Sequence, residues 1–407
     1  MNIILFDTPQ AKTQLLPFTF SRPVAHIRLG ILTIFEKWSY YISVPSQISV
    51  LAREKYLQEI FPTTWASENW YIRASVIPDS FIADTIQTLP LNTLLSDENG
   101  MIVGFRTCEK LTSFEEIELF QSRLKTEKYK AKVLFLKRPW QIFQWNRAQI
   151  ISDFKLITKG RKSQPISDAH VIVYGKENIF VEEGAVIMAS ILNASDAPIY
   201  IGKNAVVQEG SIIKGAFALC EGATVNMGAK MRGDTTVGPY SKVGGEISNS
   251  VIFGYSNKAH DGFLGNSVLG EWCNLGADTN TSNLKNNYSE VSVWSYAENK
   301  MIPTGLQFCG LFMGDHSKSS INTMFNTGTV VGFSANIFGA GFPPKHIPSF
   351  AWGGTEGFQK YELSKAQQTA EIVMKRRNVN FTTFNKQLFE AIYHSPYAFM
   401  SSQKDLS

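Results

Sequence analysis

The stretch IGKNAVVQEGSIIKGAFALCEGATVNMGAKMRGDTTVGPYSKVGGEI (residues 201–247) carries an apolar residue at every sixth position. These positions are Ile201, Val207, Ile213, Leu219, Val225, Met231, Val237 and Val243. Four positions after each of them the residue is usually small, as at Ala205, Ser211, Ala223, Ala229, Thr235 and Ser241, with Phe217 and Ile247 as exceptions. A period of six fits neither an α-helix nor an extended strand. It predicts a triangular coil in which each hexad makes a short strand and a corner, and stacked coils bury the apolar residues together.

A second run of the same repeat lies nearer the C-terminus. Its apolar positions are Phe325, Val331 and Ile337, and its small positions are Ser317, Thr323, Thr329, Ala335 and Gly341. Shorter pieces surround Val181, Ile187, Leu269 and Leu275. The phase slips between runs, so loops must interrupt the coils, and TNTSNLKNNYSE (279–290) is the clearest insertion. The pattern predicts a left-handed parallel β-helix of hexapeptide repeats over residues 166–353.

The sequence changes in character on both sides of the repeat. Strands alternating with helices are indicated by MNIILFD (1–7), LTIFEKW (32–38), KAKVLFLKRPW (130–140) and the apparent helix QIFQWNRAQIISDF (141–154). Beyond the repeat, one face of a helix is predicted from Phe381, Phe384, Leu388 and Ile392. We therefore expect an α/β domain over residues 1–140, a helical linker over 141–165, and a helical C-terminal segment over 354–407.

Composition limits the classes of function. The 407 residues carry a formal net charge of +4, with 44% hydrophobic and 18% charged residues. This mild charge gives no case for nucleic acid and suits an enzyme that handles phosphorylated substrates. The four cysteines are scattered without a CxxC pair, which argues against a disulfide framework or a zinc site. No apolar run reaches the roughly 18 residues that a membrane span needs, so we expect a cytoplasmic protein.

The segment NKAHDGFLGNSVLGEWCNLGADTN (257–280) breaks the regular hexads and carries a histidine. It resembles the catalytic segment of the bifunctional glucosamine-1-phosphate N-acetyltransferase and N-acetylglucosamine-1-phosphate uridylyltransferase family, of the hexapeptide-repeat acyltransferase superfamily. The matching positions are Lys258, Ala259, His260, Phe263, Leu264, Gly265, Asn274, Leu275, Gly276 and Ala277. The resemblance predicts an acetyl-CoA-dependent N-acyltransferase that acts on a sugar phosphate such as glucosamine-1-phosphate, in amino-sugar nucleotide synthesis.

The resemblance also implies roles for individual residues. His260 would be the general base that takes the proton from the attacking amine, which suits an imidazole with an ordinary pKa near 6.5. Asn274 would hold the sugar or the acyl group, and Lys258 and Phe263 would lie against the substrate. The family has a tyrosine where this chain has Phe263, so one hydroxyl contact of the family is missing here. Acetyl-CoA would lie along the coils between subunits of a homotrimer.

Phosphate contacts need arginine or lysine side chains. Arg232 and Lys242 precede His260 on the coils and are candidates, although surface charge on a solenoid explains them equally well. Further on, Lys375, Arg376 and Arg377 form a basic patch, which we interpret as a solvated helix end in preference to a phosphate site.

The segment LLPFTFSRPVAHIRLGILTIFEKW (15–38) resembles the start of sugar-nucleotide transferases, whose signature survives at Pro17, Thr19, Arg22 and Pro23. Arg22 and Arg28 are candidate nucleotide contacts. However, DTPQAKTQ (7–14) replaces the family's glycine-rich phosphate loop, and Val24 replaces a lysine. Ser75 stands where the Mg²⁺-binding aspartate is expected, and Asp79 is off register. Sugar-1-phosphate nucleotidyl transfer, with UTP or dTTP and with Mg²⁺, therefore stays open for this domain.

Three other functions remain open. A β-helical carbonic-anhydrase-like enzyme would need three histidines on zinc, but the six histidines are widely spread. A sugar-1-phosphate nucleotidyltransferase could use the β-helix for structure or regulation only. Finally, both sites could have decayed in a non-catalytic scaffold.

Overall fold

The computed structural model describes residues 1–42 and 46–399, and these form two compact units. The N-terminal unit comprises Met1–Leu15, Ser21–Ile27 and Leu32–Arg138. The second unit comprises Leu16–Phe20, Arg28–Ile31 and the chain from Pro139 onward. Two short segments of the N-terminal sequence thus belong to the second unit. The end of the predicted C-terminal segment, residues 400–407, lies outside the described residues.

The N-terminal unit is an α/β domain, as predicted. Its mixed sheet has the strand order β2 (Gln47–Leu51), β1 (Asn2–Phe6), β3 (Asn69–Arg73), β6 (Ile102–Thr107), β5 (Thr93–Ser96), β7 (Lys125–Lys128). A separate strand pair joins β4 (Val76–Ile77) to β8 (Leu134–Phe135). The helices are α1 (Pro9–Gln14), α2 (Ile34–Tyr41), α3 (Lys55–Ile60), α4 (Ser80–Thr88) and α5 (Phe114–Gln121). Because β1 runs parallel to both β2 and β3, the carboxyl ends of all three meet at one edge.

The apolar stretch LTIFEKW is mostly helical, which its pattern of apolar residues alone did not indicate. Most of LTIFEKW forms the start of α2. The Thr33 hydroxyl accepts a hydrogen bond from the Glu36 amide, and the Glu36 carboxylate accepts one from the Thr33 amide. This reciprocal cap begins the helix at Ile34.

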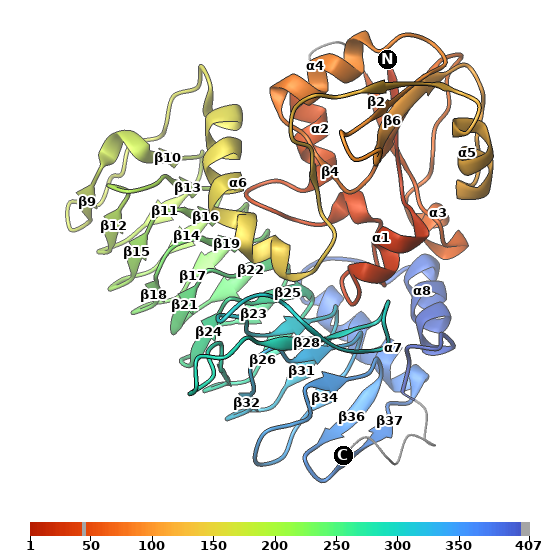
Figure 1. Cartoon of the computed structure of the whole chain (residues 1–407). Coiled ribbons are helices and arrows are strands. Elements are labelled where there is room, and N and C mark those ends of the chain that lie inside the picture. Colours follow the sequence, from red (N-terminus) through yellow and green to blue (C-terminus); the bar gives the residue numbers. More distant parts are fainter. Residues whose placement is uncertain (43–45, 400–407) are drawn as a thin grey trace. The chain divides into compact units, whose positions relative to one another are not determined.

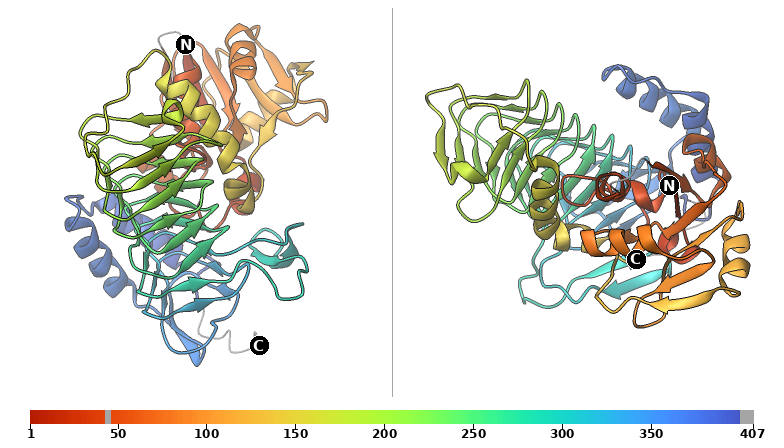
Figure 2. Two further views of the ribbon diagram at one scale, coloured as in Figure 1. Left: turned by 90° about the vertical axis from the view of Figure 1, so that its left-hand side faces the viewer. Right: turned by 90° about the horizontal axis from the view of Figure 1, so that it is seen from above.

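The second unit contains a parallel β-helix of three stacked sheets (Figure 1). The first sheet consists of β10 (Ile179–Val181), β13 (Ile199–Ile201), β16 (Phe217–Leu219), β19 (Thr235–Val237), β22 (Val251–Gly254), β25 (Val268–Glu271), β30 (Phe312–Met313), β33 (Val330–Val331) and β35 (His346–Ile347). The second consists of β11 (Val186–Ile187), β14 (Val206–Val207), β17 (Thr224–Val225), β20 (Lys242–Val243), β23 (Asn257–Lys258), β26 (Asn274–Leu275), β31 (Lys318–Ser319), β34 (Asn336–Ile337), β36 (Ala351–Gly354) and β37 (Gly357–Lys360). The third consists of β9 (Ile172–Tyr174), β12 (Ile191–Asn193), β15 (Ile212–Lys214), β18 (Lys230–Met231), β21 (Glu246–Ser248) and β24 (Phe263–Gly265). From β10 to β26 successive strands visit the three sheets in turn, and the left view of Figure 2 shows the resulting stack.

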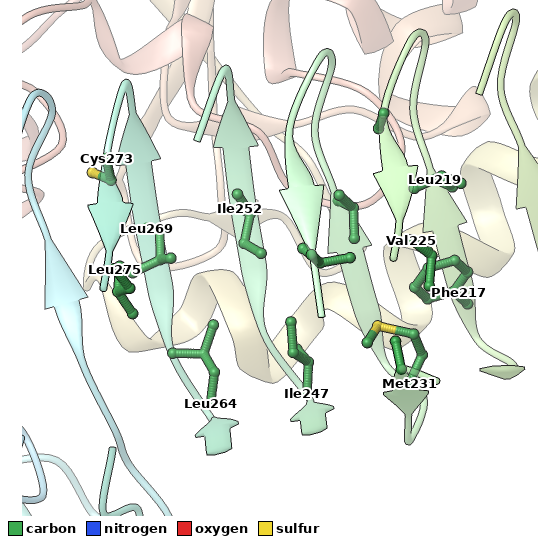
Figure 3. Close-up of a cluster of buried hydrophobic side chains, with 14 of the residues drawn as sticks. Phe217, Leu219, Val225, Met231, Ile247, Ile252, Leu264, Leu269, Cys273 and Leu275 are labelled. Atoms are coloured by element: carbon green, nitrogen blue, oxygen red, sulfur yellow. The ribbon is translucent and has the colours of Figure 1, made fainter. Parts of the chain in front are cut away.

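The core of this unit is made by the six-residue repeat. Each of the eight apolar positions from Ile201 to Val243 lies in a consecutive strand and is at most 1% exposed. Figure 3 shows side chains of the three sheets meeting inside the coils, with Leu219, Val225 and Met231 among them. The predicted triangular coil is confirmed, because residues six apart occupy equivalent places on successive sides.

A hairpin insertion interrupts the coils near the predicted position. The strand β27 (Asn280–Thr281) pairs with β32 (Met324–Phe325), and between them the hairpin β28 (Ser292–Ser295) and β29 (Lys300–Pro303) projects from the coils. The insertion is therefore longer than the 279–290 segment that its composition indicated.

Helices precede and follow the β-helix. Helix α6 (Trp140–Thr158) contacts strands β16, β19, β22 and β25 of the first sheet. After the last coil come α7 (Leu363–Lys375) and α8 (Thr383–Tyr393). In α8 the predicted face is partly wrong, because Phe384 is 46% exposed while Phe389 is fully buried. Among the described residues, no helix combines the length and the apolar character that a membrane crossing requires.

The two N-terminal segments of the second unit are integral to its packing. The Phe18 ring lies 5.2 Å from that of Phe253 and 6.4 Å from that of Phe312. The amides of Gly30 and Ile31 donate hydrogen bonds to Asn146 (2.9 Å) and Asp153 (2.8 Å) of α6. The outer surface of the β-helix is therefore completed by residues that come more than a hundred positions earlier in the chain.

Replacing Phe18 by alanine tests this packing. Phe18 is fully buried, so we expect Phe18→Ala to lower the free energy of unfolding of the second unit by about 3–5 kcal/mol through lost contacts and a cavity. Calorimetric melting would measure the loss. Phe81→Ala is the matched control, because Phe81 is 74% exposed and its truncation should leave the melting unchanged. Equal melting of both variants would contradict a packing role for Leu16–Phe20.

Candidate active site

A cavity of about 680 Å³ lies on the outer face of the second sheet, a size typical of small-molecule sites. Strands β20, β23, β26 and β31 form its floor, and the end of α7 contributes Val373, Arg376 and Arg377. The other lining residues are Lys242, Tyr255, Asn257, Ala259, His260, Trp272, Cys273, Asn274, Leu275, Gly276, Ala277, Lys318 and Ile321. All of them belong to the second unit.

His260 and Asn274 both line this cavity, and both are exposed. Asn274 pairs with Asn257 in the parallel register of β23 and β26, and its amide oxygen lies 3.4 Å from the amide nitrogen of Asn257. His260 follows Asn257 by three residues, at the corner where the coil leaves the second sheet. The structure therefore brings the predicted base and the predicted amide contact into one cavity.

The side chain of Lys258 stabilises the backbone of the corner that carries His260. This side chain is only 1% exposed, and its ammonium group donates hydrogen bonds to the carbonyl oxygens of His260 (2.5 Å) and Asp261 (2.9 Å). Asn226 donates a further bond to the carbonyl of Ala259 (2.8 Å). A Cβ atom on Gly244 would lie 2.2 Å from that same carbonyl, so only glycine fits beneath the corner. Lys258 thus contacts the backbone of the site and does not line the cavity.

Two aromatic residues that line the cavity, Tyr255 and Trp272, belong to a longer column of rings. Tyr240, Tyr255, Trp272 and His316 occupy equivalent corners with φ between 53° and 61°, where bulky side chains are rare. Their rings stack in a column, with centroids 5.2, 4.2 and 6.1 Å apart. Our sequence reasoning missed this column. Its signal was an aromatic ring immediately before the small corner residue in successive coils.

Cations surround the cavity without matching anions. Lys242, Lys318, Arg376 and Arg377 line it, and within the described part of the chain none of them forms an ion pair with a carboxylate. Burial lowers the pKa of Lys318 to about 8, and burial and the neighbouring Arg376 lower the pKa of Arg377. Such a site favours an anionic ligand.

Two predicted substrate contacts lie elsewhere in the chain. Arg232 follows β18 of the third sheet, and its guanidinium pairs with Glu246 at 2.8 Å. Phe263 begins β24 of the same sheet, and its amide donates to the side chain of Asn280 at 2.8 Å. Neither residue lines the cavity of His260 within one chain.

The two candidate nucleotide contacts belong to different units. Arg28 lies in the second unit, where it is 9% exposed and donates to the carbonyl of Ile31. Arg22 lies in the N-terminal unit and is 5% exposed, and its carbonyl accepts a bond from the Lys12 ammonium at 3.2 Å.

The N-terminal unit has its own pocket of about 340 Å³ at the carboxyl ends of β1 and β3. The lining includes Thr8, Gln10 and Arg73, and ligands commonly bind at this edge of parallel strands. The glycine-free segment 7–14 forms α1 here, capped by Thr8, whose hydroxyl accepts from the Ala11 amide at 3.2 Å. Burial raises the pKa of Asp7, at the start of this segment, to about 7.

Two aspartates of the N-terminal unit hold backbone amides. Asp79 accepts a hydrogen bond from the Ile82 amide at 2.9 Å and so caps α4. Asp7 accepts one from the Val24 amide at 3.0 Å. In the ranges that the structure describes, no group of three or more His, Cys, Asp or Glu side chains is placed to hold a metal ion.

Comparisons with known proteins find one matching family model and several curated relatives. Residues 3–162 match the family model described as sugar nucleotidyl transferase. The bifunctional sugar-1-phosphate nucleotidylyltransferase/acetyltransferase of Sulfurisphaera tokodaii is 28% identical over 142 residues, covering 34% of this chain and 35% of that protein. The bifunctional protein GlmU of Trichodesmium erythraeum is 35% identical over 86 residues, covering 21% of this chain and 18% of that protein. The predicted resemblance to bifunctional enzymes of this kind is confirmed, although the chain matches about a third or less of the length of these relatives.

Among solved structures, the polySia specific acetyltransferase NeuO aligns with 52% of this chain and 99% of its own. The sequence identity is 16% and the TM-score is 0.31, a likeness too low to carry an argument.

The buried ammonium group of Lys258 predicts a pH dependence of stability. Burial lowers its pKa from 10.5 to about 8, so between these pH values the unfolded chain binds more protons than the folded chain. Stability from this group therefore rises with pH in that window. Between pH 8 and 9.5 the free energy of unfolding of wild type should rise by on the order of 1 kcal/mol more than that of Lys258→Met.

Urea denaturation at the two pH values measures this difference. Lys230→Met, which removes an exposed lysine of β18, is the matched control and should keep the wild-type slope. The same slope in Lys258→Met and wild type would show that Lys258 does not titrate in this window.

Proposed function

We propose that this chain, whose residues 3–162 match a sugar nucleotidyl transferase model, is a transferase that acylates an amino-sugar phosphate in the cavity of its β-helix. The observation that carries the proposal is the meeting of His260, Asn274 and unpaired cations in one cavity. Glucosamine-1-phosphate is the proposed acceptor and acetyl-CoA the proposed donor, as the resemblance of residues 257–280 implies. A cytoplasmic homotrimer is the proposed assembly.

The proposed mechanism begins at the amine of the sugar. As the amine nitrogen attacks the thioester carbonyl, the imidazole of His260 accepts its proton. The C–N bond forms, the tetrahedral intermediate collapses, and the C–S bond breaks. The thiolate leaves with the proton that His260 returns. Asn274 orients the acceptor or the acyl group through its amide, while Lys258 and Asn226 hold the corner of His260 in place.

The phosphate of the acceptor suits the charge of the cavity. Lys242, on the strand before Asn257, stays a proposed phosphate contact because it lines the same cavity. Arg232 and Phe263 would contact substrate only from the third sheet, which in a homotrimer could face a neighbouring chain. A zinc-hydratase mechanism is not proposed, because no group of three or more His, Cys, Asp or Glu side chains in the described part of the chain is placed to hold a metal ion.

Thiol release tests the acyl transfer. We expect His260→Ala to lower the rate of free-thiol release from acetyl-CoA with glucosamine-1-phosphate by about a hundredfold to ten-thousandfold, because general-base catalysis is lost. His260 is exposed, so the variant should keep the wild-type melting temperature. His170→Ala is the matched control, since His170 is exposed and lies outside the cavity. Equal release by His260→Ala and wild type would remove His260 from the mechanism.

Nucleotidyl transfer by the N-terminal unit is the second candidate function. The family match and the pocket at the carboxyl ends of β1 and β3 favour it. Among the described residues no group of three or more His, Cys, Asp or Glu side chains is placed to hold a metal ion, so no metal-dependent step is assigned. The chain's own contribution would come from Arg73, whose guanidinium lines this pocket and whose pKa is lowered by burial.

Pyrophosphate release from UTP or dTTP with a sugar-1-phosphate tests this candidate. If Arg73 binds a nucleotide phosphate, Arg73→Gln should raise the KM for the nucleotide about tenfold, the effect of losing one charged hydrogen-bonding contact. Arg123→Gln is the control, because Arg123 is exposed and outside the pocket. No release by wild type with either nucleotide would assign the N-terminal unit a non-catalytic role.

A further inference from the structure

The arginines of the basic patch after α7, Arg376 and Arg377, differ from three other arginines of the second unit. Arg147, Arg161 and Arg232 each pair with a carboxylate, at 2.8, 2.6 and 2.8 Å respectively. Arg376 and Arg377 have no such partner among the described residues, although both line the cavity of His260. Arg377 is half-buried beside the exposed Arg376, so its guanidinium loses part of its hydration with no carboxylate to compensate.

The guanidinium of Arg377 contacts strand β23 on the floor of the cavity. Its Nη2 donates a hydrogen bond to Oδ1 of Asn257 at 2.9 Å. Asn257 is paired in register with Lys242 on one side and with Asn274 on the other. Arg377 is thus placed between a lysine and the amide predicted to touch substrate. A guanidinium has five N–H donors, and one neutral amide uses only one of them.

The backbone that carries the two arginines is firmly anchored. Ala370 and Met374 of α7 are 1% and 4% exposed. The helix then turns back through Asn378, which has φ of 57°, and the amides of Arg377 and Val379 both bond to the Met374 carbonyl. This is the left-handed cap that commonly ends a helix. The arginines therefore project from a fixed turn.

We propose that Arg376 and Arg377, together with Lys242, form a phosphate-binding subsite of this cavity, so that the segment after the β-helix completes the site. The proposal rests on the proposed acyl transfer and identifies where its phosphorylated ligand is held. The planar fork of a guanidinium matches the oxygens of a phosphate ester, and paired arginines with a lysine suit a phosphate monoester or diphosphate.

Both reactants of the proposed reaction carry phosphate. In an amino-sugar 1-phosphate the amine and the phosphate stand on adjacent carbons. In CoA the pantetheine arm separates the thiol from the phosphates. Asn257 precedes His260 by three residues, so their backbones lie at most roughly 10 Å apart. This bound does not decide between the phosphate of the sugar and the phosphates of CoA. The experiment therefore includes both ligands, each with a counterpart that lacks phosphate.

Calorimetric titration of the full-length protein tests the subsite without turnover. The ligands are CoA against pantetheine, and glucosamine-1-phosphate against glucosamine. We expect Arg376→Gln/Arg377→Gln to weaken binding of at least one phosphorylated ligand by tenfold to a hundredfold. Lys375→Gln is the matched control, since it removes an adjacent, exposed charge that does not line the cavity, and it should stay within twofold of wild type.

The counterparts without phosphate identify the source. Weakening for CoA but not for pantetheine assigns the subsite to the acyl donor, and weakening for the sugar phosphate but not for the free sugar assigns it to the acceptor. Unchanged affinities in the double variant would overturn the proposal. So would equal losses for ligands with and without phosphate, or wild type binding neither phosphorylated ligand.

Failure of the subsite and failure of the proposed function give different results. Binding that depends on the arginines, with no thiol release by wild type, would keep the subsite and refute acyl transfer. Thiol release by wild type, with equal ligand affinities in the double variant, would refute the subsite alone. Arg377→Lys adds a further check, because it keeps the charge but loses the fork and should recover only part of the affinity.

Discussion

The burial of one apolar side chain per six residues is the constraint on which the rest of the second unit depends. Each side of a coil places one such residue in the interior. Successive coils therefore stay in register, and their outward-facing residues align on adjacent strands. On the second sheet this alignment places Lys242, Asn257, Asn274 and Lys318 next to one another on adjacent strands. The polar surface of the site is thus a by-product of how the core packs.

Much of this architecture could be predicted from the sequence, because the repeat is local and its period is unlike that of any other fold element. The association of His260 with Asn274 was likewise predictable, since both lie in one short segment whose motif was recognised. Arg376 and Arg377 were not, because they reach the cavity only through the tertiary packing of α7 and were interpreted as a solvated helix end.

Other failures have local causes. In LTIFEKW the apolar run obscured the reciprocal cap of Thr33 and Glu36, a signal that was present in the sequence. Lys258 matched the family motif, yet its ammonium group serves backbone carbonyls inside the corner, which only coordinates reveal. The face of α8 was wrong at Phe384, because the ring that packs against Phe333 and Phe350 is that of Phe389.

The two early segments of the second unit have a consequence for synthesis. Phe18 is made long before Phe312, its partner across the packed surface. At about 5–20 residues per second, a ribosome needs on the order of tens of seconds to travel between them. During that interval the nascent chain holds Phe18 without its Phe312 neighbour, and the amides of Gly30 and Ile31 lack their acceptors until α6 has been made. The early segments 16–20 and 28–31 therefore reach their final packing only after residues far along the chain have been synthesised.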